Sequence, residues 1–476
     1  MSTASNSTAS NRIMSLLDDN SFVEIGARVT ARATDFNLKQ NATPSDGVIT
    51  GYGVINDNLV YVYSQDASVL GGSIGEMHAK KIVNLYDLAL KTGAPVIGLI
   101  DCSGLRLQEA TDALNAFGTI YAKQIEASGQ IPQITAIFGN CGGGLALIPT
   151  LTDFTFMEEK NAKLFVNSPN AVEGNYTAKC DTASAKFQAE EAGIVDVVAD
   201  ADTVLSKIRD LVSMLPANNA EDLSLVECSD DLNRVCPDLA GCAGDTSILL
   251  SQIADDNDFF ETKADYAKSM VTGFIRLNGT TVGCVANRCE IVGEDGKSEK
   301  LDGVLTAHGA EKAADFVKFC DAFSIPVLTI TNVKGFCNCA CAEKRLAKAA
   351  ATLTAAFANA TVSKVNVIVG DAIGSSYVVM NSKAIGCDLT YAWDNAKIGM
   401  MDAKIAAKII CADDKAAEAD TAAKYAQLQN SVDSAAARGY VDQIIDAADT
   451  RKYVIAAFEM LYNKNFERPL KKHTTI

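Results

Sequence analysis

The sequence predicts an α/β protein made of two copies of one domain, and three observations support this prediction. The chain has 476 residues, more than one ordinary core accommodates, so two domains of about 200 residues each are expected. Apolar segments with a period of two alternate with segments whose apolar residues recur every three or four positions, as strands and helices do. The order of these segments in the first half of the chain recurs in the second half.

Each copy begins with a short acidic segment and a pair of strands. LLDDNSFVEI at 16–25 is echoed by IADDNDFFET at 253–262. Two alternating apolar segments joined by an Asn-containing turn follow at 48–66 and again at 270–288, a pattern typical of a β-hairpin. A segment with helical spacing of its apolar residues follows each hairpin: GEMHAKKIVNLYDLALKTG in the first half and GAEKAADFVKFCDAFS in the second.

Buried strands and their turns complete each copy. GAPVIGLIDCSGLRLQEA is matched by SIPVLTITNVKGFCNCA, IPQITAIFGNCGGGLALI by VSKVNVIVGDAIGSSYVVM, and LTDFTFMEEKNAKLFVNSP by GCDLTYAWDNAKIGMMDAK. The repeated strand–strand–helix order favours a curling sheet wrapped by helices over a doubly wound sheet. The acidic stretch 216–245 is the expected linker, so the domains are predicted at 1–230 and 246–476.

Composition excludes several classes of protein. The net charge is −17, which argues against nucleic acid as a partner, because that binding depends on clustered Lys and Arg. The longest apolar runs fall well short of the roughly 20 residues that a membrane span needs, and the polar N-terminal stretch does not resemble a leader. We therefore expect a cytoplasmic protein with reduced thiols and no metal. For the run Cys337, Cys339 and Cys341, ordinary loop thiols are expected rather than a metal site.

Three consecutive glycines follow a buried strand in FGNCGGGLALIP (138–149), and the corresponding turn of the second half is GDAIGSSYVVM. The first residues of a helix leave backbone N–H groups unpaired, and glycine lets a ligand approach them closely. Two such groups directed at one oxygen form an oxyanion hole. Gly143 and Gly144 are the candidates in the first half, and Ser375 and Ser376 in the second. The alternative is that glycine only permits close packing of helix on strand.

At these motifs the chain resembles the carboxyltransferase subunits of biotin-dependent acyl-CoA carboxylases and decarboxylases, of the propionyl-CoA carboxylase beta and methylmalonyl-CoA decarboxylase alpha type. The resemblance spans nearly the whole chain. It rests on SQDASVLGGSIGEMHAKKI, GAPVIGLIDCSGLRLQEA, FGNCGGGLALIP, MVTGFIRLNGTTVG, AADFVKFCDAFSIPVLT, YAWDNAKIGMMDAK, DQIIDAADTRKYVIAAFEML and PLKKH. It implies two duplicated crotonase-like (ClpP/crotonase) ββα-spiral domains.

The function that this resemblance implies is carboxyl transfer between carboxybiotin on a separate carrier protein and the α-carbon of a short acyl-CoA. Gly143 and Gly144 would hold the thioester carbonyl oxygen. The biotin carbonyl oxygen would meet Ser375 and Ser376, beside Gly374, and no side-chain acid or base is essential. The implied partners are the biotin carboxyl carrier protein, further copies of the chain in a trimer of dimers, and either a biotin carboxylase or a membrane decarboxylase subunit. Through the last of these the chain would associate with a membrane.

The second half departs from the family pattern, whereas the first half keeps it. NVKGF at 332–336 stands where the family has D-V-P-G-F, and KAAATL at 348–353 replaces R-H-G-A-K-L. The small Gly-Gly-Ala turn of the family becomes Gly374-Ser375-Ser376. These changes fall on the biotin side and keep a non-catalytic structural paralogue open as an alternative.

Basic residues near the first-half motifs are candidates for contacts with the CoA phosphates. They are Lys80, Lys81 and Arg106, and the alternative is a solvated helix face.

Other polar residues in the same region raise a different possibility. Glu109 and Glu76 would be the acid–base pair if the chain were a biotin-independent, crotonase-type CoA-thioester enzyme, although carboxylates on helix surfaces are more common. We expect His78 to be structural rather than a base, and Trp393 to lie in the core.

Overall fold

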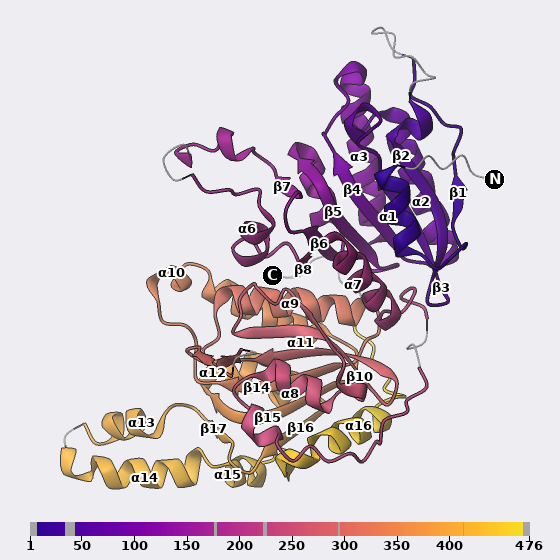
Figure 1. Ribbon diagram of the computed structural model, residues 1–476. Coiled ribbons are helices and arrows are strands. Elements are labelled where there is room, and N and C mark those ends of the chain that lie inside the picture. The colour runs from indigo at the N-terminus through magenta and orange to yellow at the C-terminus, as the bar shows by residue number, and fades with distance from the viewer. Residues whose placement is uncertain are drawn as a thin grey trace. The chain divides into compact units, whose positions relative to one another are not determined.

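The computed structural model describes residues 7–33, 43–175, 179–221, 226–293, 296–412 and 414–469. His473 and the end of the PLKKH motif lie outside these ranges. The chain divides into two compact units, Met1–Asp222 and Leu223–Ile476. Each unit consists of a mainly parallel sheet with helices packed against it (Figure 1).

The sheet of unit 1 has its strands in nearly the order of the chain. Its first three strands are antiparallel: β1 (Val23–Ile25), β2 (Val48–Ile55) and β3 (Asn58–Gln65). The others continue the sheet in parallel: β4 (Val96–Cys102), β5 (Gln133–Gly142), β6 (Phe154–Glu158) and β8 (Val197–Ala199). The short strand β7 (Lys163–Phe165) pairs with the end of β5.

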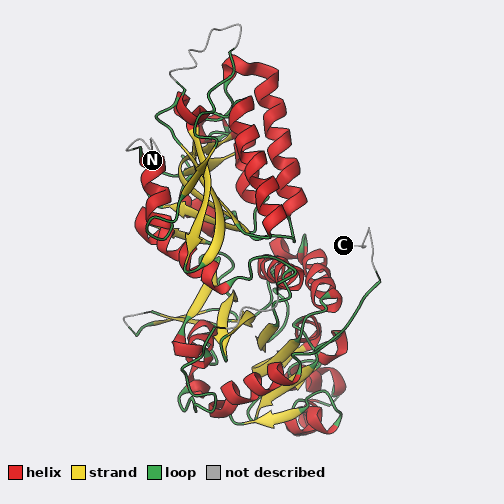
Figure 2. Cartoon of the chain, turned by 90° about the vertical axis from the view of Figure 1, so that its right-hand side faces the viewer, coloured by secondary structure: helices red, strands yellow, loops and turns green. Residues whose placement is uncertain are grey.

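The described helices of unit 1 include the crossovers that its parallel strands require. They are α1 (Thr8–Leu16), α2 (Glu76–Thr92), α3 (Ala110–Ala127), α4 (Leu147–Thr150), α6 (Ala185–Glu190) and α7 (Ala201–Met214). α2 and α3 pack against each other, and their apolar faces form the main core with the sheet, through residues such as Leu85, Phe117 and Ile137. Figure 2 shows how strongly the strands twist beside their helices.

Unit 2 repeats this order. β9 (Phe259–Thr262), β10 (Met270–Leu277) and β11 (Thr280–Asn287) are antiparallel. β14 (Val327–Val333), β15 (Lys364–Ile373), β16 (Leu389–Trp393) and β18 (Gln443–Ile445) extend the sheet in parallel, and β17 (Lys397–Gly399) pairs with the end of β15. A separate two-stranded sheet is formed by β12 (Glu290–Val292) and β13 (Ser298–Lys300).

The helices of unit 2 also follow the first copy, with α9 packed against α11 as α2 is against α3. Trp393 is buried in the core, as expected, and its indole N–H donates to the Thr450 hydroxyl. The helices are α8 (Thr246–Ile253), α9 (Ala307–Ala322), α10 (Ala340–Glu343), α11 (Leu346–Asn359), α12 (Gly374–Val379), α13 (Ala403–Ile410), α14 (Glu418–Gln429), α15 (Val432–Ala437) and α16 (Thr450–Met460).

The duplication extends to strand register and to the hairpin turns. Val96 at the start of β4 lies opposite Gln133 of β5, and Val327 of β14 lies opposite Lys364 of β15 in the same way. The predicted hairpins β2–β3 and β10–β11 are both present, and each turn contains an Asn with positive φ, Asn56 or Asn278. The sequential strand order agrees with the predicted curling sheet and excludes a doubly wound one.

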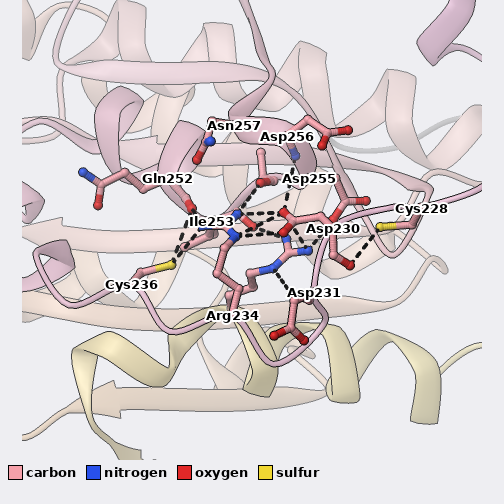
Figure 3. A network of polar contacts seen from close by, with 12 residues as sticks. Cys228, Asp230, Asp231, Arg234, Cys236, Gln252, Ile253, Asp255, Asp256 and Asn257 are labelled. Atoms are coloured by element: carbon pink, nitrogen blue, oxygen red, sulfur yellow. Dashed lines mark hydrogen bonds and ion pairs between the residues drawn. The ribbon is translucent and has the colours of Figure 1, made fainter.

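The stretch predicted as a linker is in large part a component of unit 2. Leu239 is fully buried and Cys236 nearly so, both within the core of unit 2. Arg234 binds the Asp230 carboxylate at 2.9 Å and the Ala254 carbonyl at 2.8 Å. Figure 3 shows Arg234 beside Asp230 and Asp255 in this network. Asp230 and Asp255 also pair with the buried guanidinium of Arg451 from α16. Charge pairing of this acidic stretch with the buried Arg451 and the half-buried Arg234, which composition does not reveal, thus fixes the segment to unit 2.

No helix in the described part of the chain is long and apolar enough to cross a membrane.

Candidate active site

The triple glycine lies where β5 leaves the sheet, and Gly142 and Gly143 are required there for different reasons. β5 ends at Gly142, and a 3₁₀ turn, Gly143–Ala146, leads directly into α4. A Cβ on Gly142 would lie 2.5 Å from the Phe165 ring, so this glycine permits close packing. Gly143 has φ +64°, which disfavours any residue with a Cβ, and no atom lies within 4 Å of where that Cβ would be. Packing therefore explains Gly142, and an open backbone explains Gly143.

Tyr121 of α3 fixes the orientation of this turn. Its hydroxyl donates to the Gly144 carbonyl at 2.5 Å, and its ring stacks on Phe117 with 5.8 Å between centroids. The trans peptide places the Leu145 N–H opposite the Gly144 carbonyl, so this contact sets the direction of the peptide that follows the donors. The N–H groups of Gly143 and Gly144, at the first positions of the turn, are not used by the bonds of the turn itself. The turn can therefore direct two amides at one oxygen.

Unit 2 has a matching turn. β15 ends at Ile373, and α12 begins with Gly374, whose φ is +67°. Because β5 and β15 have the same length and register, Gly374 is the counterpart of Gly143, and Ser375 is the counterpart of Gly144. Counting from the matched prolines, Pro95 and Pro326, gives the same pairing, so the expected match of Gly143 with Ser375 is one residue off.

Side chains hold the second turn differently from the first. The hydroxyl of Ser376, which is fully buried, donates to the Ile373 carbonyl at 2.7 Å and so closes the turn from within. Ser375 is exposed. A Cβ on Gly374 would lie 3.3 Å from the Met400 carbonyl oxygen. The N–H groups of Gly374, Ser375 and Ser376 are the first three of α12, which its own bonds leave unused.

Both turns lie at the carboxyl ends of central parallel strands, the edge where open α/β sheets bind ligands. In unit 1 a hollow of about 590 Å³ is lined by β7 and the segment after it, including Phe165, which pairs with Gly142 at the end of β5. A second hollow, of about 410 Å³, lies at the ends of β3 and β4, between Gln65, Asp66 and Asp101.

The side chains at the ends of β4 and β14 correspond as well. Asp101 binds Arg12 at 3.1 Å, and Asn332, its counterpart, accepts the Asp371 N–H at 3.1 Å. A Cβ on Gly139 would lie 2.0 Å from Oδ1 of Asp101, and a Cβ on Gly370 would lie 2.6 Å from Oδ1 of Asn332. Each glycine therefore leaves room for the side chain on the neighbouring strand. The acid-to-Asn change noted in NVKGF therefore leaves a polar side chain that ties β14 to β15.

Lys81 and Arg106 are used inside unit 1. The Lys81 ammonium is buried and donates to the Ser45 and Val48 carbonyls, and burial lowers its pKa to about 8. Lys312 does the same in unit 2, where it donates to the Met270 carbonyl at 2.8 Å. The repeat of this buried lysine shows that it serves the fold.

The Arg106 guanidinium is fully buried and pairs with Asp46 at 2.5 Å and with Glu109 at 2.9 Å. Burial raises the pKa of Asp46, while Arg106 acts to lower it. Lys80 is exposed, and its ammonium lies 2.7 Å from Glu76. Of the three basic candidates, Lys80 alone has an exposed ammonium, so Lys81 and Arg106 are not part of the proposal below.

The carboxylates and the histidine also have structural partners. Glu109 accepts the Glu76 N–H at 2.6 Å and so caps α2, while the Glu76 carboxylate pairs with Lys80 and Arg32. The ring Nδ1 of His78 lies 2.9 Å from the Asp46 carbonyl oxygen, and burial lowers its pKa to about 3. The expected structural role of His78 agrees with these contacts.

The cysteines of the second half lie in the loop after β14. Cys337 is half-buried, and Cys339 and Cys341 are exposed. Within the described ranges no group of three or more His, Cys, Asp or Glu side chains is arranged to hold a metal ion.

Comparisons with known proteins define the class of the protein. The family described as "Carboxyl transferase domain" matches residues 3–476. The propionyl-CoA carboxylase beta chain of Roseobacter denitrificans is 40% identical over 484 residues, covering 98% of this chain and 93% of that protein. Methylmalonyl-CoA decarboxylase subunit alpha of Veillonella parvula is 37% identical over 481 residues, covering 98% and 92%. The chain therefore belongs to the carboxyl transferase family.

A solved structure confirms the fold. Transcarboxylase 12S, crystallised as a hexamer assembly with hydrolysed methylmalonyl-coenzyme A bound, superposes with a TM-score of 0.91 at 35% identity, covering 98% of this chain and 92% of that one. The predicted pair of crotonase-like α/β domains is correct. The chain is an enzyme, a biotin-dependent acyl-CoA carboxyltransferase.

Sequence reasoning did not single out Tyr121, although it orients the first turn. Its spacing of four from Phe117 puts the two on one helix face, which reads as ordinary core. Only the contact with the Gly144 carbonyl distinguishes it.

Proposed function

We propose that the two glycine-led turns are the two oxyanion holes of this enzyme, one for an acyl-CoA in unit 1 and one for biotin in unit 2. The observation that carries the proposal is the recurrence of a left-handed glycine, Gly143 and Gly374, at the carboxyl end of the same strand of each sheet. A packing role alone does not require positive φ at both positions.

In unit 1 the Gly143 and Gly144 amides would donate to the thioester carbonyl oxygen. Negative charge gathers on that oxygen whenever a carboxyl group leaves or joins the adjacent α-carbon. Fixed donors aimed at such an oxygen each contribute about 3 kcal/mol in the transition state. The amides need no proton exchange with a side chain, which agrees with Glu109 being committed to Arg106 and to the cap of α2.

In unit 2 the Ser375 and Ser376 amides, reached past Gly374, fit the carbonyl oxygen of a cyclic urea, which offers only acceptor lone pairs. Biotin supplies the nitrogen that carries the carboxyl group, and it would arrive on a separate carrier protein. Because the donors are backbone N–H groups, the serine substitutions in the turn keep these donors and change only the side chains around the site. The buried Ser376 hydroxyl holds the turn and leaves the amides for the ligand.

The similarity to propionyl-CoA carboxylase and methylmalonyl-CoA decarboxylase supports a short acyl-CoA as the substrate, with three carbons as the first choice. Because carboxyl exchange is reversible, its direction depends on the partner, a biotin carboxylase or a membrane decarboxylase subunit. Further copies of the chain are proposed partners, in line with the hexamer described for transcarboxylase 12S.

A carboxyl-exchange assay tests this function. The purified chain would be given malonyl-, methylmalonyl-, ethylmalonyl- or glutaconyl-CoA, each labelled in the free carboxyl group, with and without free biotin. We expect loss of label that depends on biotin and is fastest with methylmalonyl-CoA.

Two results would contradict the proposal. One is the absence of biotin-dependent loss from all four esters, which would favour a structural paralogue. The other is thioester turnover without biotin that disappears in Glu109→Gln, which would favour a hydratase-type enzyme.

A further inference from the structure

The loop between β14 and α11 brings three sulfur atoms together near the surface. The Cys339 and Cys341 sulfurs lie 2.7 Å apart, and the Cys337 sulfur lies 3.6 Å from that of Cys339. In unit 1 the corresponding loop contains the buried Arg106. The matching bridges Ile74–Leu105 and Leu305–Phe336 show that Cys337 occupies the position of Arg106 in unit 2. The loop of unit 2 thus has three thiols where the loop of unit 1 has a buried ion pair.

The surroundings of these thiols favour reaction at Cys339. The Ala342 N–H donates to its sulfur at 3.3 Å. The Cys341 thiol, which donates to the same sulfur, lowers the pKa of Cys339, and this contact raises the pKa of Cys341. Both side chains are exposed, whereas Cys102 is buried and burial raises its pKa to about 12. An exposed thiol of lowered pKa beside a second thiol is the arrangement of a redox-active pair.

We propose that Cys339 and Cys341 are a thiol modification site that hydrogen peroxide oxidises to a reversible disulfide. The Cys339 thiolate attacks the peroxide, its O–O bond breaks, and Cys339 becomes a sulfenic acid while hydroxide leaves and takes up a proton as water. The Cys341 sulfur then attacks the Cys339 sulfur, the S–O bond breaks, and a second water carries away the oxygen and the thiol proton. Two thiols lose two electrons, and the peroxide is reduced to two waters.

The disulfide would change the start of α10. Cys339 is the N-cap of this helix through its bond from the Ala342 N–H, and a disulfide sulfur is a poorer acceptor than a thiolate. α10 follows β14, which is the parallel neighbour of β15, so the loop and the Gly374 turn lie at the same edge of the sheet. If the Gly374 turn binds biotin, as proposed above, oxidation of the pair alters the rim of that site and slows biotin-dependent exchange.

Mass spectrometry of the full chain tests the disulfide independently of activity. The reduced protein would be treated with hydrogen peroxide, alkylated and digested with trypsin, which releases residues 335–344 with all three thiols and residues 180–186 with Cys180. We expect the first peptide to lose two hydrogens and to carry one alkyl label, on Cys337. This disulfide should form about tenfold faster than the exposed, solitary Cys180 is oxidised and loses its label. Dithiothreitol should restore three labels.

Variants assign the roles of the two sulfurs. Cys337→Ser should form the disulfide as the wild type does. Cys337→Ser/Cys341→Ser should instead accumulate a sulfenic acid on Cys339 that dimedone traps. The proposal is overturned if Cys180 oxidises as fast as the cluster, if Cys337→Ser abolishes the disulfide, or if the cluster pairs with a thiol elsewhere.

Activity gives a separate readout. Peroxide should slow biotin-dependent exchange by the wild type, with recovery in dithiothreitol, and should leave Cys339→Ser at its untreated rate. Exchange that continues unchanged with the disulfide formed would overturn the proposed effect on the site. An absence of exchange in the reduced protein would contradict the proposed function, and the disulfide would still be decided by mass.

Discussion

Replacing Gly143 with alanine distinguishes a catalytic role of the glycine turn from a role in packing alone. The added methyl group meets no atom within 4 Å, so steric overlap does not disturb the fold. Gly143 has φ +64°, at which an L-residue costs about 1–2 kcal/mol relative to its relaxed conformation. The variant should therefore remain folded, with the Tm of unit 1 lowered by roughly 2–8 °C.

The effect on activity should be much larger than the effect on stability. Either the turn keeps its shape and the methyl group occupies the open space in front of the amides, or φ relaxes to negative values and the donors turn away. Loss of one oxyanion donor lowers kcat by about 10²–10³. We expect this loss in biotin-dependent exchange, measured beside a thermal unfolding curve. Gly143→Val, with a branched Cβ, should abolish exchange.

Gly439→Ala is the matched control. Gly439 has φ +76°, no atom lies within 4 Å of its Cβ position, and it follows α15, outside both turns. It should show a similar loss of Tm and exchange at the wild-type rate. The reasoning is refuted if Gly143→Ala exchanges within threefold of wild type, or if Gly439→Ala loses as much activity.

Three further changes test the assigned roles. Tyr121→Phe removes the bond that orients Gly144 and should reduce kcat about fivefold with little change in KM, since such a bond is worth about 1 kcal/mol; a larger loss in KM than in kcat would contradict this role. Glu109→Gln weakens a buried ion pair, so we expect a clearly lower Tm but exchange within threefold of wild type, and loss of exchange without loss of Tm would make Glu109 catalytic. His78 has a folded pKa of about 3, below its unfolded value of 6.5, so its contribution is complete above pH 6.5 and is lost as the pH falls towards 3. The stability difference between wild type and His78→Asn should therefore narrow by about 1.4 kcal/mol per pH unit below pH 6, as denaturant unfolding at pH 4–7.5 would show; a constant difference would mean that the histidine is protonated in the fold.

Much of the fold could be predicted because its signals are local. The alternating strands around Asn56 and Asn278, the helices after them and the apolar strands leading to the glycines follow from spacing alone. The boundary between the units falls inside the predicted linker 216–245, but the later part of that stretch packs into unit 2. An acidic stretch with two prolines has the composition of a connector, yet Arg451, far away in the sequence, neutralises it inside unit 2.

The site was predictable in its backbone and not in its side chains. Gly143 stands out because a left-handed backbone conformation favours glycine, so the residue type alone signals that conformation. Lys81 and Arg106 looked available for phosphates because a sequence shows charge without showing partners. In the fold, Lys81 meets carbonyl oxygens, and Arg106 meets two carboxylates.

The sequence by itself determined the duplication, the order of elements, the family and the glycines that begin each turn. These properties depend on residue type and spacing along the chain. Tertiary structure alone decided that Tyr121 orients the first turn and which charges are buried in pairs. Such facts depend on strand register and on contacts between residues distant in the chain, and the free energy of those contacts is set only once the sheet has closed around them.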